Sequence, residues 1–363
     1  MIPRLQQRSG GIRNVPVSVR VPVIMAAAIL LVLALGGAPG SALSPVIYLP
    51  NDAQASEGGQ TQEGQAPGQQ PFHIDVSLVV LPVTVTDHRG RLISGLTQDD
   101  FQVYEDGEQQ AITQFSHEDV PITVGLVLDN SGSMGANRAA VAQAATDFLS
   151  RSNPQDELFV VNFNQRVSLG LPESVPFTSD VAQLREAVER GTARGTTAMY
   201  DALDVALDHL SLGTTMRKAL ILISDGGDNA SHRRFADVLH AAEHRTALVY
   251  CIGLVSEDAE DVNPGVLKRL AKATGGQAFF PDAPAKLPAI TEEIARDLRE
   301  QYTLAYVPSN TRRDGSYRTI RVNVKAEGHG KLVVRTRPGY YAPAAAGEKV
   351  STAAPARPLR SSP

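Results

Sequence analysis

The apolar run at residues 124–128 constrains the fold of this chain more than any other segment, because it ends abruptly in polar residues. Aliphatic residues in an unbroken run predict a strand buried on both faces, which is typical of a parallel sheet. Asp129, Ser131 and Ser133 follow at alternate positions, on the loop at the carboxyl end of that strand. Clustered hard oxygen ligands suit Mg²⁺ or Mn²⁺ better than Zn²⁺, although a plain Ser/Gly turn is the simpler alternative.

Strand and helix patterns alternate through residues 120–300, which predicts an α/β domain with a doubly wound, mainly parallel sheet. The predicted strands are residues 123–128, 158–163, 219–224, 247–254 and 277–280, and the predicted helices are residues 138–150, 181–190, 198–210, 234–244, 266–273 and 287–299. Ligands of such sheets bind outside the carboxyl ends of the strands, near a reversal in strand order. Asp129 and Asp225 both end predicted strands, and Thr197 precedes a predicted helix, so we expect the three to converge.

The segment Asp129-Asn-Ser131-Gly-Ser133 resembles the first motif of the von Willebrand factor type A domain, where it opens the metal-ion-dependent adhesion site. Two further pieces follow in the family's order: a Thr in a Gly-rich loop, and Asp225 at the end of a later strand. The resemblance covers about residues 121–300. Family members usually show Gly-Gly-Thr where this chain shows Gly-Thr-Thr, so Thr196 stays an alternative to Thr197. The resemblance implies a Mg²⁺ or Mn²⁺ ion held by Asp129, Ser131, Ser133, Thr197 and Asp225.

The implied ligand set favours recognition over catalysis. Three hydroxyls and two carboxylates form a weakly charged shell that leaves at least one position for an outside ligand. The resemblance implies that an Asp or Glu of a partner protein takes this position. A metal-dependent hydrolase is the first alternative, but no His falls within the three motif segments to act as a general base. A scaffold with a purely structural metal is the second.

Residues 72–119 and 301–342 show a different pattern, of short strands separated by turns. Ile320, Val322 and Val324 alternate with polar residues, which predicts a strand with one buried face. Each segment has too few strands to form a stable sheet alone. We therefore expect the two segments to form one small β-sandwich, with the α/β domain inserted between them. Pro82, inside the first strand, predicts a bulge or an edge.

The flanking motifs extend the resemblance beyond the α/β domain. The spacings Val83-x-Val-x-Asp-x-x-Gly and Asp100-Phe-x-Val-x-Glu-Asp-Gly are similar to those of bacterial, largely acidobacterial, secreted proteins related to the type A family. The role of those proteins is poorly defined. This part of the resemblance therefore predicts architecture rather than purpose.

The N-terminal segment has the features of an export signal. Residues 1–42 contain four Arg, then an apolar run at residues 21–35, then the small residues Gly40-Ser41-Ala42. This order predicts a cleaved signal peptide, with an uncleaved membrane anchor as the alternative. Residues 43–71 predict a flexible linker and residues 343–363 a disordered tail. We expect the protein in the periplasm, at the cell surface or in the medium.

Composition excludes some classes of function. The net charge of −5, with no basic cluster in the middle of the sequence, argues against a nucleic-acid binder. Cys251 is the only Cys, so no internal disulfide can form, and its apolar neighbours predict a buried thiol. The oligomeric state is left open.

Four other titratable residues stand out in the α/β segment. Asp201 is expected to favour the positive end of a helix. Asp228 is expected to be a solvated turn residue, with an acid that supports the metal ligands as the alternative. His240 and His244 lie one helical turn apart, as a candidate zinc pair would, but no third ligand accompanies them at a recognised spacing. We therefore expect no zinc site there.

Overall fold

The computed structural model describes residues 78–254 and 263–344, which belong to one compact unit, Phe72–Pro363. The predicted export signal and linker, and nearly all of the predicted tail, lie outside the described residues. Within the described ranges, no helix has the length and apolar character needed to cross a bilayer.

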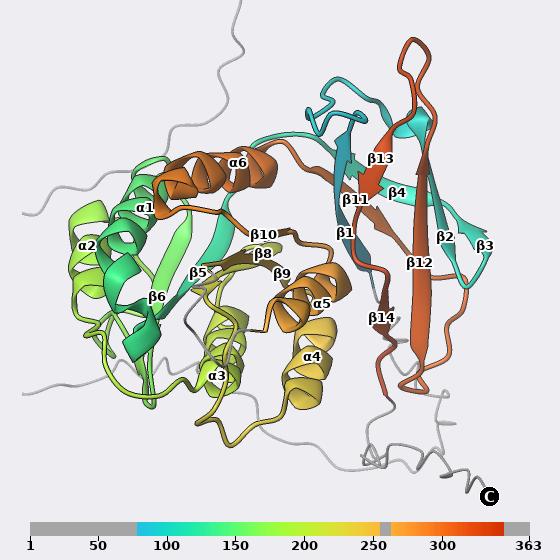
Figure 1. Ribbon diagram of the computed structural model, residues 1–363. Helices are drawn as coiled ribbons and strands as arrows, with labels where there is room; N and C mark the ends of the chain where they lie inside the picture. Colours follow the sequence, from blue (N-terminus) through green and yellow to red (C-terminus); the bar gives the residue numbers. More distant parts are fainter. Residues whose placement is uncertain (1–77, 255–262, 345–363) are drawn as a thin grey trace, which may run out of the picture. The chain divides into compact units, whose positions relative to one another are not determined.

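The predicted α/β domain is present and is built on a six-stranded sheet in the order β10-β9-β8-β5-β6-β7 (Figure 1). Its strands are β5 (Ile122–Asp129), β6 (Glu157–Phe163), β7 (Val167–Leu169), β8 (Arg217–Ser224), β9 (Leu248–Gly253) and β10 (Ala278–Phe279). All neighbours are parallel except β7, which pairs antiparallel with β6 at one edge. The sequence prediction missed β7, because three half-exposed or exposed residues carry no recognisable period.

Six helices cover the two faces of this sheet. They are α1 (Arg138–Ser150), α2 (Val181–Glu189), α3 (Met199–Ser211), α4 (Phe235–His244), α5 (Pro264–Thr274) and α6 (Leu287–Arg299). Helix α1 contacts both α2 and α6 on one face, while α3, α4 and α5 form a second group on the other (Figure 1). The predicted bounds of α1 and α6 are confirmed, and the remaining helices differ from prediction by one or two residues at an end.

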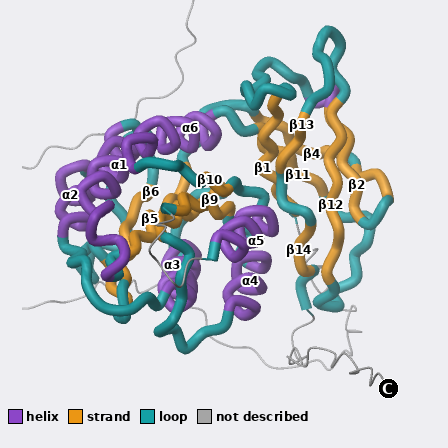
Figure 2. Tube along the Cα trace, in the orientation of Figure 1, coloured by secondary structure: helices purple, strands orange, loops and turns teal. Residues whose placement is uncertain are grey.

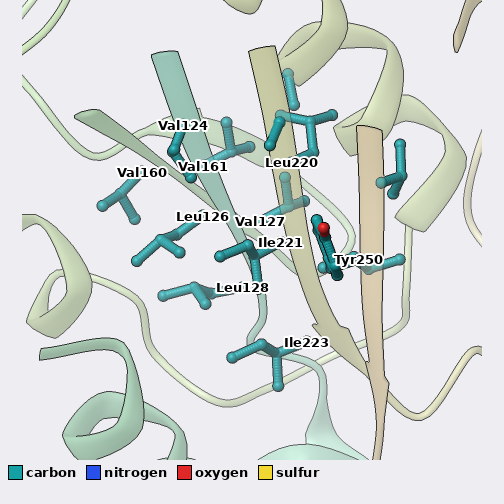
Figure 3. Packing of buried hydrophobic residues seen from close by; sticks show 14 of the residues in the cluster. Val124, Leu126, Val127, Leu128, Val160, Val161, Leu220, Ile221, Ile223 and Tyr250 are labelled. Atoms are coloured by element: carbon teal, nitrogen blue, oxygen red, sulfur yellow. The ribbon is translucent and has the colours of Figure 1, made fainter. Parts of the chain in front are cut away.

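Strand β5 lies at the centre of the sheet and is buried along its whole length. Leu126 and Leu128 project from β5 into the apolar cluster of the domain, with Ile221 of β8 close by (Figure 3). Full burial of an aliphatic side chain contributes about 1.5–3 kcal/mol. Packing around Gly125 is so tight that a Cβ atom there would lie 2.3 Å from the Phe159 ring. The core therefore fixes the position and register of β5.

The flanking segments form two four-stranded antiparallel sheets, in the orders β13-β1-β11-β4 and β14-β12-β2-β3 (Figure 2). Their strands are β1 (Val79–Thr86), β2 (Phe101–Glu105), β3 (Glu108–Gln110), β4 (Ile112–Ser116), β11 (Tyr302–Tyr306), β12 (Tyr317–Val324), β13 (Val333–Arg335) and β14 (Gly339–Tyr341). One apolar cluster contains side chains from both sheets. N-terminal and C-terminal strands thus build the sandwich together, as the sequence predicts.

Pro82 lies in a part of β1 that pairs with a neighbouring strand on one side only. Residues Val79–Val83 pair in continuous register with β11, whereas β13 pairs with Thr84–Thr86. The Pro82 carbonyl accepts a hydrogen bond from the Thr336 hydroxyl at 2.8 Å. The expectation of a local edge is confirmed, and the alternative of a bulge at this position is wrong.

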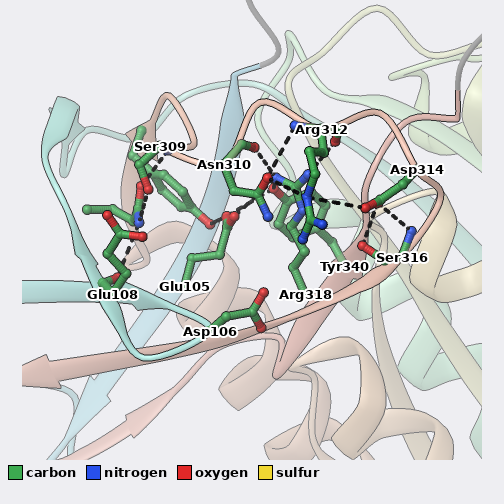
Figure 4. A network of polar contacts seen from close by, with 12 residues as sticks. Glu105, Asp106, Glu108, Ser309, Asn310, Arg312, Asp314, Ser316, Arg318 and Tyr340 are labelled. Carbon is green, nitrogen blue, oxygen red and sulfur yellow. Dashed lines mark hydrogen bonds and ion pairs between the residues drawn. The ribbon is translucent and has the colours of Figure 1, made fainter.

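A buried ion pair lies in the β14-β12-β2-β3 sheet. The Arg318 guanidinium of β12 lies 3.1 Å from the Glu105 carboxylate of β2, with side-chain exposures of 3% and 2% (Figure 4). Tyr306 and Tyr340 donate their hydroxyls to the same carboxylate at 2.7 and 3.0 Å. Because both charges are removed from water, each depends on the other for compensation.

Replacing Arg318 with Met should destabilise the fold by about 3–5 kcal/mol, because Glu105 would keep a buried charge without its partner. Urea denaturation followed by circular dichroism measures the change. Arg321→Met is the matched control, since Arg321 lies on the same strand with an exposed side chain; it should cost no more than about 1 kcal/mol, the contribution of its cation–π contact with the Tyr104 ring at 4.9 Å. Equal losses in the two variants would contradict this role of the pair.

Candidate metal centre

The candidate centre lies at the point where the strand order of the sheet reverses. The chain leaves β5 toward β6 on one side, while β8 pairs with β5 on the other side. Asp129 is the last residue of β5, and Asp225 directly follows the last residue of β8. Leu128 pairs with Ile223 across these strands, so the two carboxylates leave the sheet at one edge. Such an edge is where open α/β sheets bind ligands.

Hydrogen bonds bring four of the predicted ligands together. The Ser131 amide donates to Asp129 Oδ1 at 2.8 Å, and the Ser131 and Ser133 hydroxyl oxygens lie 3.1 Å apart. The Ser133 hydroxyl donates to Asp225 Oδ2 at 2.6 Å. The result is a continuous group of oxygen atoms contributed by the loops that follow β5 and β8.

Both carboxylates of the group are withdrawn from water. Asp129 is 2% exposed and Asp225 is 4% exposed, and neither forms an ion pair within the described residues. Burial raises the pKa of Asp129 to about 6, and the charge of Asp225 acts in the same direction. Hydrogen bonds from Ser224, at 2.6 Å, and from Ser131 oppose this rise. Two buried carboxylates and two hydroxyls at one place fit a hard divalent cation, which would relieve their repulsion.

The loop that carries Thr197 is fastened to both of the other loops. Gly132 donates its amide to the Gly195 carbonyl at 3.0 Å, and Thr197 donates its amide to Asn229 Oδ1 at 2.9 Å. Gly195 has φ of +80°, a conformation that favours glycine. Thr197 is buried and Thr196 is exposed, so burial favours Thr197 as the fifth ligand.

The comparison with protein families agrees with this geometry. Residues 124–227 match the von Willebrand factor type A domain. The matched segment contains all five predicted ligands of the type A domain, from Asp129 to Asp225.

Individual relatives of the type A domain are distant. An uncharacterized protein of Synechocystis sp. is 27% identical over 173 residues, which are 46% of this chain and 39% of that protein. The chain therefore spans about two fifths of the length of this curated relative. A von Willebrand factor type A structure from Catenulispora acidiphila is 16% identical, covers 76% of each chain and has a TM-score of 0.46.

A second solved structure is proximal thread matrix protein 1 of the mussel byssus, with a zinc-occupied metal-ion-dependent adhesion motif. It is 18% identical, covers 54% of this chain and 50% of that chain, and has a TM-score of 0.45. At these identities the likeness does not extend to function.

Two acidic residues lie beside the candidate centre, and one of them differs from its predicted role. Asp228 is half-buried and accepts hydrogen bonds from the Tyr200 amide at 3.3 Å and the Ser231 hydroxyl at 2.6 Å. The prediction of a solvated turn residue is therefore wrong. Asp201 lies in the first turn of α3 as expected, but its carboxylate also accepts from the backbone amides of His232 and Arg233. Both acids tie the loop after β8 to the start of α3.

Three histidines of the α/β domain lie close to titratable side chains. His232 Nδ1 lies 3.1 Å from Asp201 Oδ2, a pair that the three motifs do not reveal because His232 falls beyond the last of them. The Nε2 atoms of His240 and His244 lie 3.1 Å apart. Within residues 78–254 and 263–344, no three His, Cys, Asp or Glu side chains are grouped to hold a metal. The histidine pair thus lacks a third ligand of these types among those residues.

Replacing Ser224 with Ala should destabilise the metal-free protein by about 1–3 kcal/mol, because Asp129 Oδ2 would lose its hydroxyl donor inside the core. The Gly226 amide, which donates to Ser224 Oγ at 3.0 Å, would lose its acceptor as well. Urea denaturation in EDTA measures the loss. Ser211→Ala, at the exposed end of α3, is the control and should change stability by less than about 0.5 kcal/mol. An equally small effect at Ser224 would show that its hydroxyl does not support Asp129.

Proposed function

We propose that this chain is an exported, non-enzymatic binding protein, which uses a divalent cation in its type A domain to capture an acidic side chain of a partner protein. One observation carries the proposal: two buried carboxylates are joined through serine hydroxyls and form no ion pair with any residue that the structure describes. Type A domains are commonly metal-dependent interaction modules, which agrees with this reading. Export is supported only by the N-terminal sequence pattern.

Five residues would hold Mg²⁺ or Mn²⁺ in this proposal, namely Asp129, Ser131, Ser133, Thr197 and Asp225. The bound ion supplies an electrophilic position that an outside carboxylate oxygen can take. The two carboxylates of the chain balance the ion's charge, while the three hydroxyls add none. A third carboxylate from a partner is therefore attracted rather than repelled.

The serine contacts favour docking over hydrolysis. A serine nucleophile requires a base within hydrogen-bond distance of its hydroxyl. The Ser133 hydroxyl donates to Asp225, which this proposal treats as a metal ligand rather than as a base, and the His232 ring lies against Asp201 rather than against a serine. These contacts support a hydroxyl that serves as a ligand.

The loop contacts also favour docking over a purely structural metal. The Gly132–Gly195 and Thr197–Asn229 hydrogen bonds join the three loops through protein groups alone. These two hydrogen bonds support a site whose loops are held by protein groups as well as by an ion. We infer that cation binding adds a recognition point to loops that are already in place.

Adding Mg²⁺ should raise the melting temperature of the protein, because the ion binds the folded state preferentially. At a free concentration 100 times the dissociation constant, the gain is about 2.7 kcal/mol. Differential scanning calorimetry in Mg²⁺ and in EDTA measures the shift. Asp129→Asn should abolish it while folding normally, since an amide removes the buried repulsion with little change in shape.

Asp282→Asn is the control for this measurement, because Asp282 is exposed and pairs with Lys286 outside the site. Its Mg²⁺ response should equal that of the wild type. A wild-type protein without a Mg²⁺ response would contradict the proposal, and loss of folded structure in EDTA at 25 °C would favour the structural-metal alternative.

Thr197→Val should weaken Mg²⁺ binding about tenfold or more, because a methyl group replaces the ligand hydroxyl at nearly constant volume. Thr196→Val is the matched control, since Thr196 is the adjacent residue and is exposed. Isothermal titration calorimetry with Mg²⁺ compares the two variants. The opposite order of effects would assign the ligand to Thr196.

A further inference from the structure

A pocket of about 380 Å³ opens beside the candidate metal centre, at the carboxyl ends of β5 and β6. Asn130, between the ligands Asp129 and Ser131, lines one side of it, and Arg194, three residues before Thr197, lines another. The pocket and the metal centre are therefore built from the same two loops. Its further lining includes Asn162, Gln165, Arg166 and Arg190.

Three arginines meet at this pocket although they are spread along the sequence. Arg190 is already engaged, with Nη1 donating to the Gly170 carbonyl at 3.0 Å and Nη2 lying 2.8 Å from Glu186. Arg166 and Arg194 are exposed, and neither forms an ion pair with any residue that the structure describes. No Asp or Glu lines the pocket. Two guanidinium groups therefore remain available to an outside anion.

The walls of the pocket are held by internal hydrogen bonds. The Asn130 amide donates to the Leu128 carbonyl at 3.1 Å and to Asn162 Oδ1 at 3.0 Å, while Arg138 donates to Asn130 Oδ1. The Asn130 carbonyl accepts from the Arg194 amide at 2.9 Å. Because these polar groups satisfy one another, the free binding capacity of the pocket lies in its arginines.

We propose that the partner presents an acidic protein segment with at least two carboxylates, one directed to the metal centre and another to Arg166 and Arg194. This inference rests on the proposed function and adds the charge pattern of the partner. A guanidinium recognises a carboxylate through paired N–H donors, so each arginine can also orient the segment.

The charge of the chain favours an acidic protein over a nucleic acid as the partner. The chain carries a net charge of −5, so a long polyanion meets repulsion outside this small basic area. A short acidic segment needs only the pocket and the adjacent ion. The sequence predicts no basic cluster here, because the three arginines come together only when the loops after β6 and α2 fold side by side.

The test uses the full chain and two synthetic peptides, with binding followed by NMR chemical-shift changes. One peptide contains a single Asp in a Gly/Ser sequence, and the other adds two Glu after the Asp. In Mg²⁺, the wild type should bind the three-acid peptide about three- to tenfold more tightly, as two exposed ion pairs predict. The variant Arg166→Gln/Arg194→Gln should bind both peptides alike, with unchanged Mg²⁺ affinity. Lys325→Gln/Lys331→Gln, which removes two exposed charges from the sandwich, should keep the preference.

The outcomes separate the two proposals. An equal preference in the wild type and in the Arg166/Arg194 variant would overturn the inference and leave the proposed function intact. Single-acid binding that is unchanged by EDTA would instead contradict the proposed function. Arginine-dependent binding of a short DNA duplex in EDTA, at the same strength as the three-acid peptide, would overturn the inference in favour of a nucleic-acid partner.

Discussion

The pairing of β5 with both β8 and β6 is the constraint on which the site depends. In-register parallel pairing of Val124–Leu128 with Ala219–Ile223 leaves no freedom for β5 to slip, because a one-residue shift would bring a side chain to the place of Gly125, where a Cβ atom would lie 2.3 Å from the Phe159 ring. Asp129 and Asp225 must therefore emerge side by side, despite the desolvation that raises the pKa of Asp129. Burial of the aliphatic core offsets the free-energy cost of placing these carboxylates together. Two buried carboxylates at one edge of the sheet are an arrangement that suits a divalent cation.

Another buried carboxylate, that of Asp297, joins the six-stranded sheet to the sandwich. Asp297 of α6 accepts hydrogen bonds from the Thr84 hydroxyl of β1 and the Tyr250 hydroxyl of β9, each at 2.7 Å, and pairs with Arg335 of β13. One side chain thus contacts three strands from two sheets. Because each partner satisfies a group that is buried, the contact specifies how these elements meet rather than adding much net stability. Asp297 pairs with Arg335, whereas Asp129 and Asp225 form no ion pair within residues 78–254 and 263–344.

The elements that could be predicted from the sequence are those with a short-range periodicity or an ordered motif. The apolar run before Asp129 and the alternation of strand and helix patterns through residues 120–300 are local signals, so the sheet, its helices and the positions of Asp129 and Asp225 follow from them. Arg318 could not be predicted in this way. The alternation that places Ile320 inward places Arg318 inward as well, while its charge argues against burial. Its partner Glu105 lies on the neighbouring strand β2, which is far away in the sequence. The hydrogen bonds of Asp228, the His232–Asp201 pair and the arginine pocket all join residues across loops, where no period in the sequence reports proximity.

Asn130 belongs both to the wall of the pocket and to the loop of the candidate metal centre. Its backbone connects Asp129 to Ser131, while its side chain is held by Asn162 and Arg138 and its carbonyl by the Arg194 amide. A ligand that displaces Arg194 therefore acts on Asn130, and the residues on either side of Asn130, Asp129 and Ser131, are proposed metal ligands. Since buried, mutually satisfied polar groups resist independent movement, the two halves of the site should respond to an acidic partner together rather than one at a time.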